Sequence, residues 1–399
     1  MQYRTGKGRE VLEFESAKEA AERLGVTVRA VQKWAKDNRI KGAKRLGREW
    51  LIPANASPDT ENDGQAEVRH QFMPLLTNSF VPGFCNDLIE SFEDEGDRMI
   101  ATAEYNYYKG NTRKAAEISE LYLDHEDLAL SLSAGFIYVF ANLSSGKHRL
   151  VKLGLNNISL RVGQALEAKD DKTLYAYGVF MESAVLLLLH HRSDDTHRLS
   201  DVMADLPKGL KLFGAYLLAH KAYLDKEYSR GAGIAEGALL AREEAYPVAS
   251  LYLKIIRTVC LMNLKNPAEA KKSFAEINRI ALDEKFYQPF VEHHGLLQGI
   301  VEAEIKKSHP EGYKEVVGMV ESFSTGWSIL YNELTSNNVT VRLTTTEFAV
   351  AMLFNRSWSV KEISAHMDIS PRMVKHHLAV IYQKLDVSNR EELGQYLLK

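Results

Sequence analysis

Residues 359–385 read SVKEISAHMDISPRMVKHHLAVIYQKL and decide the fold at the C-terminal end of the chain. Ser359 with Glu362 three residues later is the pattern of a capping box, which predicts the start of a helix. A tight turn is expected next, because Ser370 followed by Pro371 predicts the start of a second, longer helix. The segment therefore predicts a helix, a short turn and a longer helix.

The second predicted helix has two different faces. An apolar stripe is formed by residues spaced three or four apart, namely Val374, Leu378, Ile381 and Leu385. Polar and small residues lie on roughly the opposite side, namely Arg372, Lys375, His376, Ala379 and Gln383. An ordinary amphipathic helix with a solvated face has the same periodicity. A helix that docks by one face and offers cations on the other also suits the DNA major groove.

A wider set of residues around this segment resembles the LuxR/GerE family of bacterial transcription regulators. The matching positions are Leu343-Thr344, Glu347, Glu362-Ile363, Ser370, Val374, His377, Lys384-Leu385 and Arg390. Residues 371–385 would then be the recognition helix. The resemblance implies DNA contacts from Arg372, Met373, Lys375, His376, Ala379 and Lys384.

The same resemblance implies a dimer contact and shows some departures. A fourth helix over 389–398 would supply the apolar dimer surface, with Leu393, Tyr396 and Leu397. Met373 stands where the family usually has Thr. Glycine is common at three turn positions that hold other residues here, namely Ser357, Asp368 and Asp386. Aspartate tolerates the left-handed conformation better than most residues, so the fold is expected to survive.

The N-terminal end predicts a second helix-turn-helix. Ser16 and Glu19 form another capping box, and Thr27 caps a further helix after a turn at Gly25. A hairpin with a basic strand and turn is expected over 40–53. The arrangement resembles the excisionase/MerR-like winged helix-turn-helix. That resemblance implies DNA contacts from Thr27, Arg29, Gln32, Lys33, Lys36, Lys44, Arg45 and Arg48.

Helical patterns with short breaks fill the middle of the chain. Pairs of predicted helices with small facing residues, such as those around Gly110-Asn111, resemble tetratricopeptide repeats. We predict a mostly all-α chain in which a helical-repeat solenoid stands between two helix-turn-helix domains, the first with a small β-hairpin wing. The predicted boundaries are 1–53 for the first domain, 54–81 for a linker, 82–334 for the solenoid and 340–399 for the last domain.

Charge and composition restrict the function classes. The net charge is −3, but residues 1–52 carry +6, residues 53–339 carry −11 and residues 340–399 carry +2, so only the ends attract a phosphate backbone. Cys85 and Cys260 are too few for a disulfide framework, which favours a reducing compartment. The start lacks a signal-peptide pattern and the apolar run 184–189 is too short to span a bilayer. We expect a cytoplasmic, nucleoid-associated bacterial protein.

Catalytic, cofactor and metal sites are not predicted. Gly146-Lys147 lacks the glycine and the hydroxyl residue of a phosphate-binding loop. The pairs His190-His191 and His293-His294 have acidic neighbours, but adjacent histidines on a helix point to different sides. We therefore expect a chain that is not an enzyme, uses no cofactor and holds no metal.

The leading prediction is a sequence-specific DNA-binding transcription regulator that binds double-stranded DNA as a homodimer. The weak positive charge of residues 340–399 favours a second chain, or the N-terminal module, as a source of affinity. The helical middle would sense a small molecule, dock a peptide or protein, or mediate self-association. The alternative is an interaction scaffold whose helix-turn-helix modules do not bind DNA.

Overall fold

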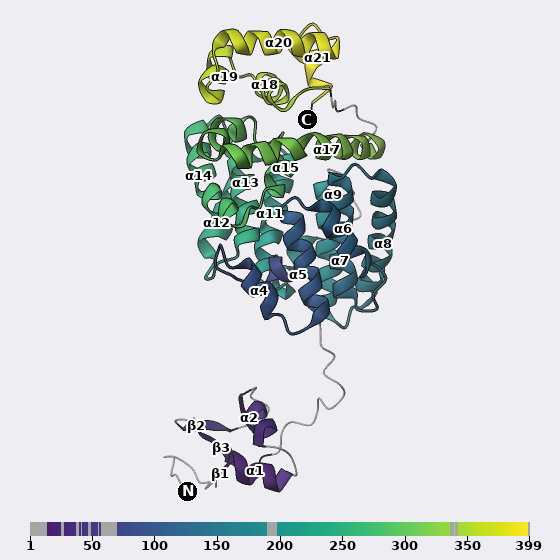
Figure 1. The fold of residues 1–399 in the computed structure, drawn as a ribbon, viewed down its shortest axis with the longest axis vertical. Helices are drawn as coiled ribbons and strands as arrows, with labels where there is room; N and C mark the ends of the chain where they lie inside the picture. The colour runs from purple at the N-terminus through teal and green to yellow at the C-terminus, as the bar shows by residue number, and fades with distance from the viewer. Residues whose placement is uncertain are drawn as a thin grey trace. The chain divides into compact units, whose positions relative to one another are not determined.

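The computed structural model describes residues 14–24, 28–36, 40, 42–46, 49–54, 56, 70–189, 198–335, 339 and 342–397. The chain falls into two compact units divided between residues 69 and 70. Each unit is described by itself below, and the described elements are helical apart from one small sheet (Figure 1). The prediction of a mostly all-α chain is confirmed.

The first unit is a small helix pair on a three-stranded sheet. Its helices are α1 (Ala17–Leu24) and α2 (Val28–Lys36), and its strands are β1 (Phe14–Ser16), β2 (Lys44–Leu46) and β3 (Glu49–Pro53). The sheet is antiparallel with order β1-β3-β2, and Phe14 pairs with Pro53 and Lys44 with Leu51. The capping box that starts α1 is present: Ser16 N donates to Glu19 Oε2 at 2.7 Å, and Glu19 N donates to Ser16 Oγ at 3.2 Å.

Small and branched side chains fill the core of the first unit, namely Ala17, Ala20, Ala21, Val31, Ala35, Ile40 and Ile52. Arg23 links α1 to β1 and to the segment after β3, because its guanidinium donates to Glu15 Oε1 at 2.6 Å and to the carbonyl of Ala56 at 2.8 Å. Strand β1 was not predicted, since three residues are too short to show an alternating pattern.

The second unit holds the middle and the C-terminal helices. Its first half contains α3 (Pro74–Thr77), α4 (Cys85–Ser91), α5 (Glu95–Tyr108), α6 (Thr112–Glu120), α7 (Leu128–Ser144), α8 (His148–Glu167) and α9 (Lys172–Leu188). After it come α10 (Leu199–Val202), a 3₁₀ turn (Met203–Asp205), α11 (Lys208–Leu224), α12 (Tyr228–Ala241), α13 (Pro247–Asn263), α14 (Pro267–Glu284) and α15 (Gln288–His293). A π-helical turn η2 (Val301–Ile305), α16 (Lys306–Ser308) and α17 (Pro310–Thr335) lead to α18 (Thr345–Asn355), α19 (Val360–Met367), α20 (Pro371–Leu385) and α21 (Arg390–Gly394).

Neighbouring helices of the middle pack closely because small residues let their backbones approach. A Cβ on Gly154 of α8 would lie 2.7 Å from Val139 of α7, and a Cβ on Gly135 of α7 would lie 2.9 Å from Ile158 of α8. Gly110 turns the chain between α5 and α6 with a φ of +86°, which favours glycine. The predicted helix pairs are confirmed, while the tetratricopeptide resemblance stays a prediction.

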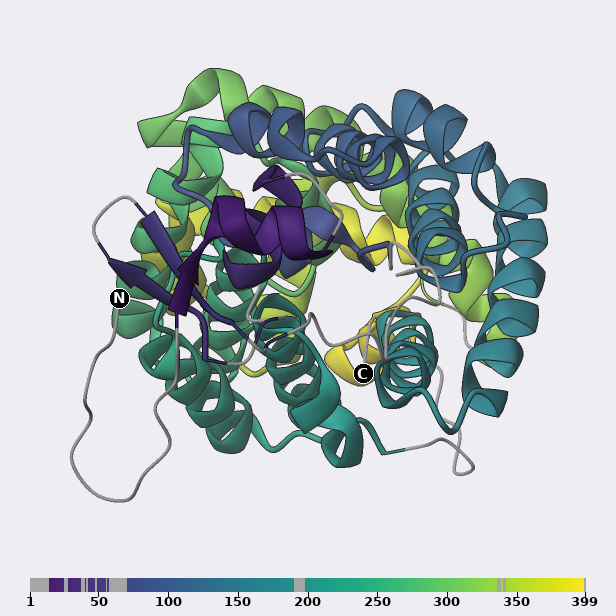
Figure 2. The ribbon, with the colours of Figure 1, turned by 90° about the horizontal axis from the view of Figure 1, so that it is seen from below.

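The array of helices closes on itself. Figure 2 shows the helices of this unit following one another around it. Glu284, at the end of α14, accepts hydrogen bonds from Gly83 N at 2.6 Å and from Cys85 N at 3.1 Å. In a one-dimensional stack each repeat contacts only its neighbours, whereas here an early and a late segment of the helical middle are also in contact.

The predicted linker 54–81 is too long at its C-terminal end. Phe72, Met73, Leu75 and Leu76 are buried in the core of the second unit. Glu104, which is fully buried in α5, holds this segment by accepting from Leu75 N at 2.8 Å and from Leu76 N at 3.2 Å. Residues 70–81 are therefore part of the helical middle, and their docking site lies on helices that the local pattern could not indicate.

Burial raises the pKa of Glu104 to about 8, against the opposing effect of these two backbone hydrogen bonds. The folded chain keeps the Glu104 proton while the unfolded chain loses it near pH 4.5, so stability falls as pH rises from about 4.5 to 8. We predict that Glu104→Gln reduces this fall by roughly 1–4 kcal/mol. Chemical denaturation at pH 6 and pH 8 measures it, with the exposed Glu120→Gln as control. Equal pH dependence in both variants and the wild type would contradict the assignment.

Candidate nucleic-acid interface

Helices α18 to α21 form the C-terminal domain. Two of these helices begin with complete capping boxes. Thr344 N and Ser359 N donate to Glu347 Oε2 at 2.8 Å and Glu362 Oε2 at 2.7 Å, and each glutamate N–H donates back to the hydroxyl. Ser370 Oγ accepts from Met373 N at 3.2 Å and starts α20 with Pro371 in its first turn. The predicted starts at Ser359 and Ser370 are confirmed, whereas the capping box at Thr344 was not predicted.

The turns between the helices need left-handed backbone at non-glycine residues. Ser357, Asp368 and Asp386 have φ values of 64°, 55° and 53°. These are the three positions where the family commonly has glycine. Asp368 ends α19 and Asp386 ends α20. Aspartate tolerates the left-handed conformation better than most residues, so it can replace glycine at both turns.

The two faces of α20 are separated as the periodicity predicted. Val374, Ile381 and Leu385 are buried, and Leu378 is partly buried against the same core. The exposed side chains form a surface that we call the outer face of α20, with members Arg372, Met373, Lys375, His376, Ala379 and Gln383. In Figure 1 α20 lies at the top of its domain, farther from α17 than α18 does. The outer face of α20 is therefore exposed and is not used to pack the domain on the helical middle.

Lys384, which the resemblance predicts to contact DNA, is exposed on α20, but its charge is paired within the domain. Its Nζ donates to both carboxylate oxygens of the buried Glu347, at 2.9 and 2.7 Å. Burial raises the pKa of Glu347, but the bonds from Lys384 and from the Thr344 backbone outweigh it and hold the pKa below its usual value. Lys384 thus ties α20 to the start of α18.

The predicted apolar dimer surface needs correction. Leu393 is 0% exposed and Leu397 is 2% exposed, because both pack into the core of their own chain. Tyr396 is partly buried, and Leu398 lies outside the described residues. Helix α21 is short and packs on α18 with Leu393 as its buried residue. The spacing of apolar residues alone does not distinguish such a packing face from a surface patch. Leu393 and Leu397 are therefore not offered at the surface of this chain, and the homodimer itself stays a prediction.

The N-terminal unit presents a similar cationic helix. Arg29, Gln32, Lys33 and Lys36 of α2 are exposed, whereas Val31 and Ala35 on its other face are buried. Lys44 and Arg45 are exposed on β2, the first strand of the hairpin. Thr27 and Arg48, also predicted to contact DNA, lie outside the described residues.

The C-terminal domain docks on the middle of the second unit by α18 and α19. Phe348 of α18 packs directly on Gly295, where a Cβ would lie 2.7 Å from the ring. His366 of α19 is buried and donates from Nε2 to the carbonyl of Gln298 at 3.0 Å. Arg356 donates to Tyr223 Oη at 2.8 Å, and Lys307 pairs with Asp368 at 2.6 Å. Docking therefore uses the back of the domain and leaves the outer face of α20 exposed.

Comparison with known families agrees with this geometry. Residues 341–397 match the family described as bacterial regulatory proteins of the luxR family. Residues 16–56 match the family described as a helix-turn-helix domain. Neither a curated protein nor a solved structure matches the chain. The chain thus carries two helix-turn-helix DNA-binding domains, which support a DNA-binding transcription regulator.

A membrane-spanning segment is not found in the described part of the chain, where each helix is too short or too polar to cross a bilayer.

Candidate metal ligands in the described part of the chain gather at His70, Asp94 and Asp97. His70 Nδ1 lies 3.0 Å from Asp94 Oδ1, and Asp97 Oδ1 accepts from Gln71 N at 2.9 Å. These contacts hold residues 70 and 71 against the start of α5.

Lys375 and Lys384 should behave differently although both are lysines of one helix. We predict that Lys375→Ala lowers the slope of log affinity for DNA against log salt by about 1, because one phosphate contact is lost. Lys384→Ala should instead lower stability by roughly 1–2 kcal/mol, because it leaves Glu347 buried without its cation. Salt titration of DNA binding and thermal denaturation separate the two. Equal effects of both variants on the salt slope would contradict the roles assigned here.

Proposed function

We propose that this chain is a sequence-specific transcription regulator that reads base edges with the outer face of α20. The observation that supports this proposal best is that the C-terminal domain uses different surfaces for packing and for exposure to solvent. The stripe of α20 and the back of α18 and α19 are used in packing, while the cationic face of α20 stays exposed. Arg372, Lys375 and His376 can donate to base edges and phosphates, and Ala379 leaves room for close approach.

The proposal gives the N-terminal domain a second contact with DNA. Exposed Arg29, Gln32 and Lys33 on α2 would enter a major groove, and the basic strand β2 would approach phosphates. The C-terminal domain has a net charge of only +2, so it gains from a partner module. A homodimer is the other source of affinity that we propose. The helical middle then serves as the sensing or docking part, and no catalytic step is assigned to the chain.

The test uses the full-length chain and DNA that it selects from a random library. We predict that Lys375→Ala with His376→Ala weakens binding to the selected site by at least about tenfold, since each base-reading side chain is worth roughly 1–3 kcal/mol. Arg29→Ala with Lys33→Ala should weaken it independently. Gel-shift titration at two salt concentrations gives both values.

Lys314→Ala is the matched control, because Lys314 is exposed on α17 and pairs with the exposed Glu311 rather than facing α20. It should leave affinity unchanged. Failure to enrich any sequence, or equal affinity in wild type and the Lys375/His376 variant, would overturn the proposal. A protein partner that survives nuclease treatment would then favour the scaffold alternative.

A further inference from the structure

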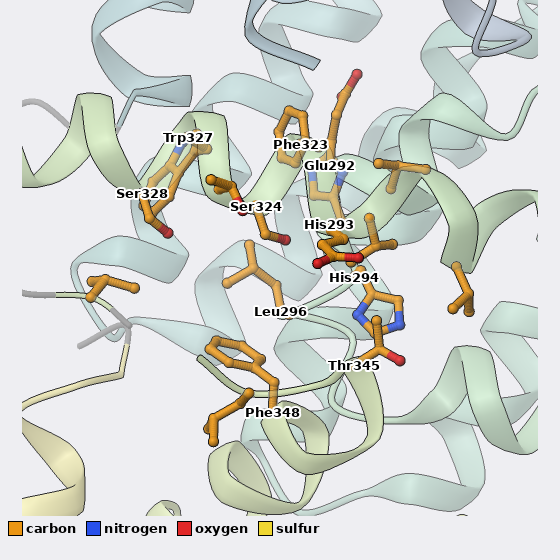
Figure 3. A pocket seen from close by; sticks show the side chains of 18 of the residues that line it. Glu292, His293, His294, Leu296, Phe323, Ser324, Trp327, Ser328, Thr345 and Phe348 are labelled. Carbon is orange, nitrogen blue, oxygen red and sulfur yellow. The ribbon is translucent and has the colours of Figure 1, made fainter. Parts of the chain in front are cut away.

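A cavity of about 360 Å³ lies between the helical middle and the C-terminal domain (Figure 3). We call it the interdomain cavity. One wall comes from α17, a second from residues 291–296 at the end of α15, and a third from residues 342–348 at the start of α18. Its size falls within the range of cavities that hold small organic ligands, and such sites occur preferentially between domains.

The apolar lining of the interdomain cavity combines aliphatic side chains with four aromatic rings that come from three helices. Phe323 and Trp327 come from α17, Phe140 from α7 and Phe348 from α18. Trp327 is rigidly placed, because its Nε1 donates to the carbonyl of Leu188 at 3.2 Å and its ring stacks on Tyr331 at 4.6 Å. Preformed rings on several walls favour a flat aromatic ligand.

The uncharged polar part of the lining consists of hydroxyl residues. Ser324 and Ser328 lie one turn apart on α17, and Thr345 lies at the start of α18. Figure 3 shows Ser324 and Ser328 on the α17 side and Thr345 beside His294. Hydroxyls both donate and accept, so they can orient a hydroxyl, carbonyl or amine of a ligand without a formal charge.

The buried ionisable groups at the interdomain cavity form hydrogen bonds to other residues of the protein. The two oxygens of Glu292 accept from Tyr107 at 2.5 Å and from Tyr252 at 2.9 Å. His293 bonds the Pro289 carbonyl and the Tyr216 hydroxyl, both at 2.8 Å, and His294 pairs with Glu302. At the rim the exposed Arg342 and Glu321 have opposite signs. The lining therefore offers no excess charge to neutralise an ionic ligand.

Burial lowers the pKa of His293 to about 4, so this imidazole is neutral near pH 7. Burial also raises the pKa of Glu292 to about 7, against the hydrogen bonds from Tyr107 and Tyr252. The neutral His293 offers no cation to an anionic ligand. A carboxyl with a pKa of about 7 is partly ionised near pH 7, but both oxygens of Glu292 already accept hydrogen bonds from Tyr107 and Tyr252. A charged ligand would therefore lose its hydration there without a free ionic partner.

We propose that the interdomain cavity binds an uncharged aromatic small molecule and that this ligand raises the affinity of the chain for DNA. The regulatory part rests on the proposed function. The cavity is complete only when the C-terminal domain supplies its third wall, so a ligand that fills it stabilises the docked arrangement. A fixed placement of α20 favours binding to paired DNA sites, because less orientational freedom is lost.

The binding test uses three probes that share one ring system. 2-Naphthol is neutral, 2-naphthoate is an anion and 2-naphthylmethylammonium is a cation. With the full-length chain and no DNA, calorimetry or ligand-observed NMR should show saturable 2-naphthol binding that is at least tenfold tighter than that of either ion. No saturable binding of 2-naphthol, or equal binding of an ion, would overturn the proposal.

The location is tested with residues that fill the cavity. Ser324→Trp and, from the opposite wall, Thr345→Phe should each weaken 2-naphthol binding at least tenfold. Lys314→Trp adds the same bulk at an exposed position of α17 and should leave binding unchanged. Thermal denaturation identifies which filling variant is folded. Unchanged 2-naphthol binding in a folded filling variant would place the ligand elsewhere and overturn the assignment.

The regulatory arm adds saturating 2-naphthol to the gel-shift titration. We expect DNA affinity to rise at least threefold in the wild type and to stay constant in a folded filling variant. An unchanged wild-type affinity would overturn the regulatory claim while leaving the binding site standing. If the chain bound no DNA at all, the proposed function would fail, and the binding result without DNA would still decide the ligand site.

Discussion

The packing of α17 across the turns of the helical middle determines where the C-terminal domain lies. Gly326 of α17 meets the α7 backbone so closely that a Cβ would lie 2.4 Å from the Leu143 carbonyl oxygen. Ser322 donates to the Ser144 carbonyl at 2.8 Å, and Trp327 donates to the carbonyl of Leu188. Helix α17 thus covers the ends of α7 and α9, as Figure 1 shows, and then delivers the chain to α18. Glycine at 326 is what permits this approach, since any side chain would push the two helices apart.

Docking by the back of the C-terminal domain has a functional consequence. Phe348, His366 and Arg356 all contact the helical middle, and none of them lies on α20. The buried His366 keeps its proton on Nε2 to serve the Gln298 carbonyl, and burial lowers its pKa to about 4, so the contact holds near neutral pH. The outer face of α20 therefore stays exposed while the helical middle holds the opposite side of the C-terminal domain.

Local features of the fold could be predicted because their causes lie within a few residues. The capping boxes at Ser16 and Ser359, the cap at Ser370 and the stripe of α20 each depend on neighbours three or four positions away. The left-handed turn residues Asp368 and Asp386 belong to the same class. The sequence therefore indicated both helix-turn-helix domains and the exposed face of α20.

Features made by distant parts of the chain could not be predicted. Glu104 holds residues 75 and 76 from a helix that lies about thirty residues away, and Glu347 holds Lys384 across 37 residues. Leu393 and Leu397 resemble a surface stripe in the sequence, but both are buried in the core of the second unit. The interdomain cavity joins residues 140, 188, 291–296 and 342–348, and no local pattern marks such a set.

The central claim is that the C-terminal domain binds DNA while docked, and one cross-linking measurement tests it most directly. Lys307 and Asp368 form an ion pair across the interface, and the native Cys85 and Cys260 are both buried. A Lys307→Cys, Asp368→Cys chain can therefore be joined there with a short bis-maleimide. The joined chain is expected to bind its selected DNA site within about threefold of the same chain left unjoined. Loss of DNA binding on joining would contradict the claim, because α20 would then have to leave the docked position to reach DNA.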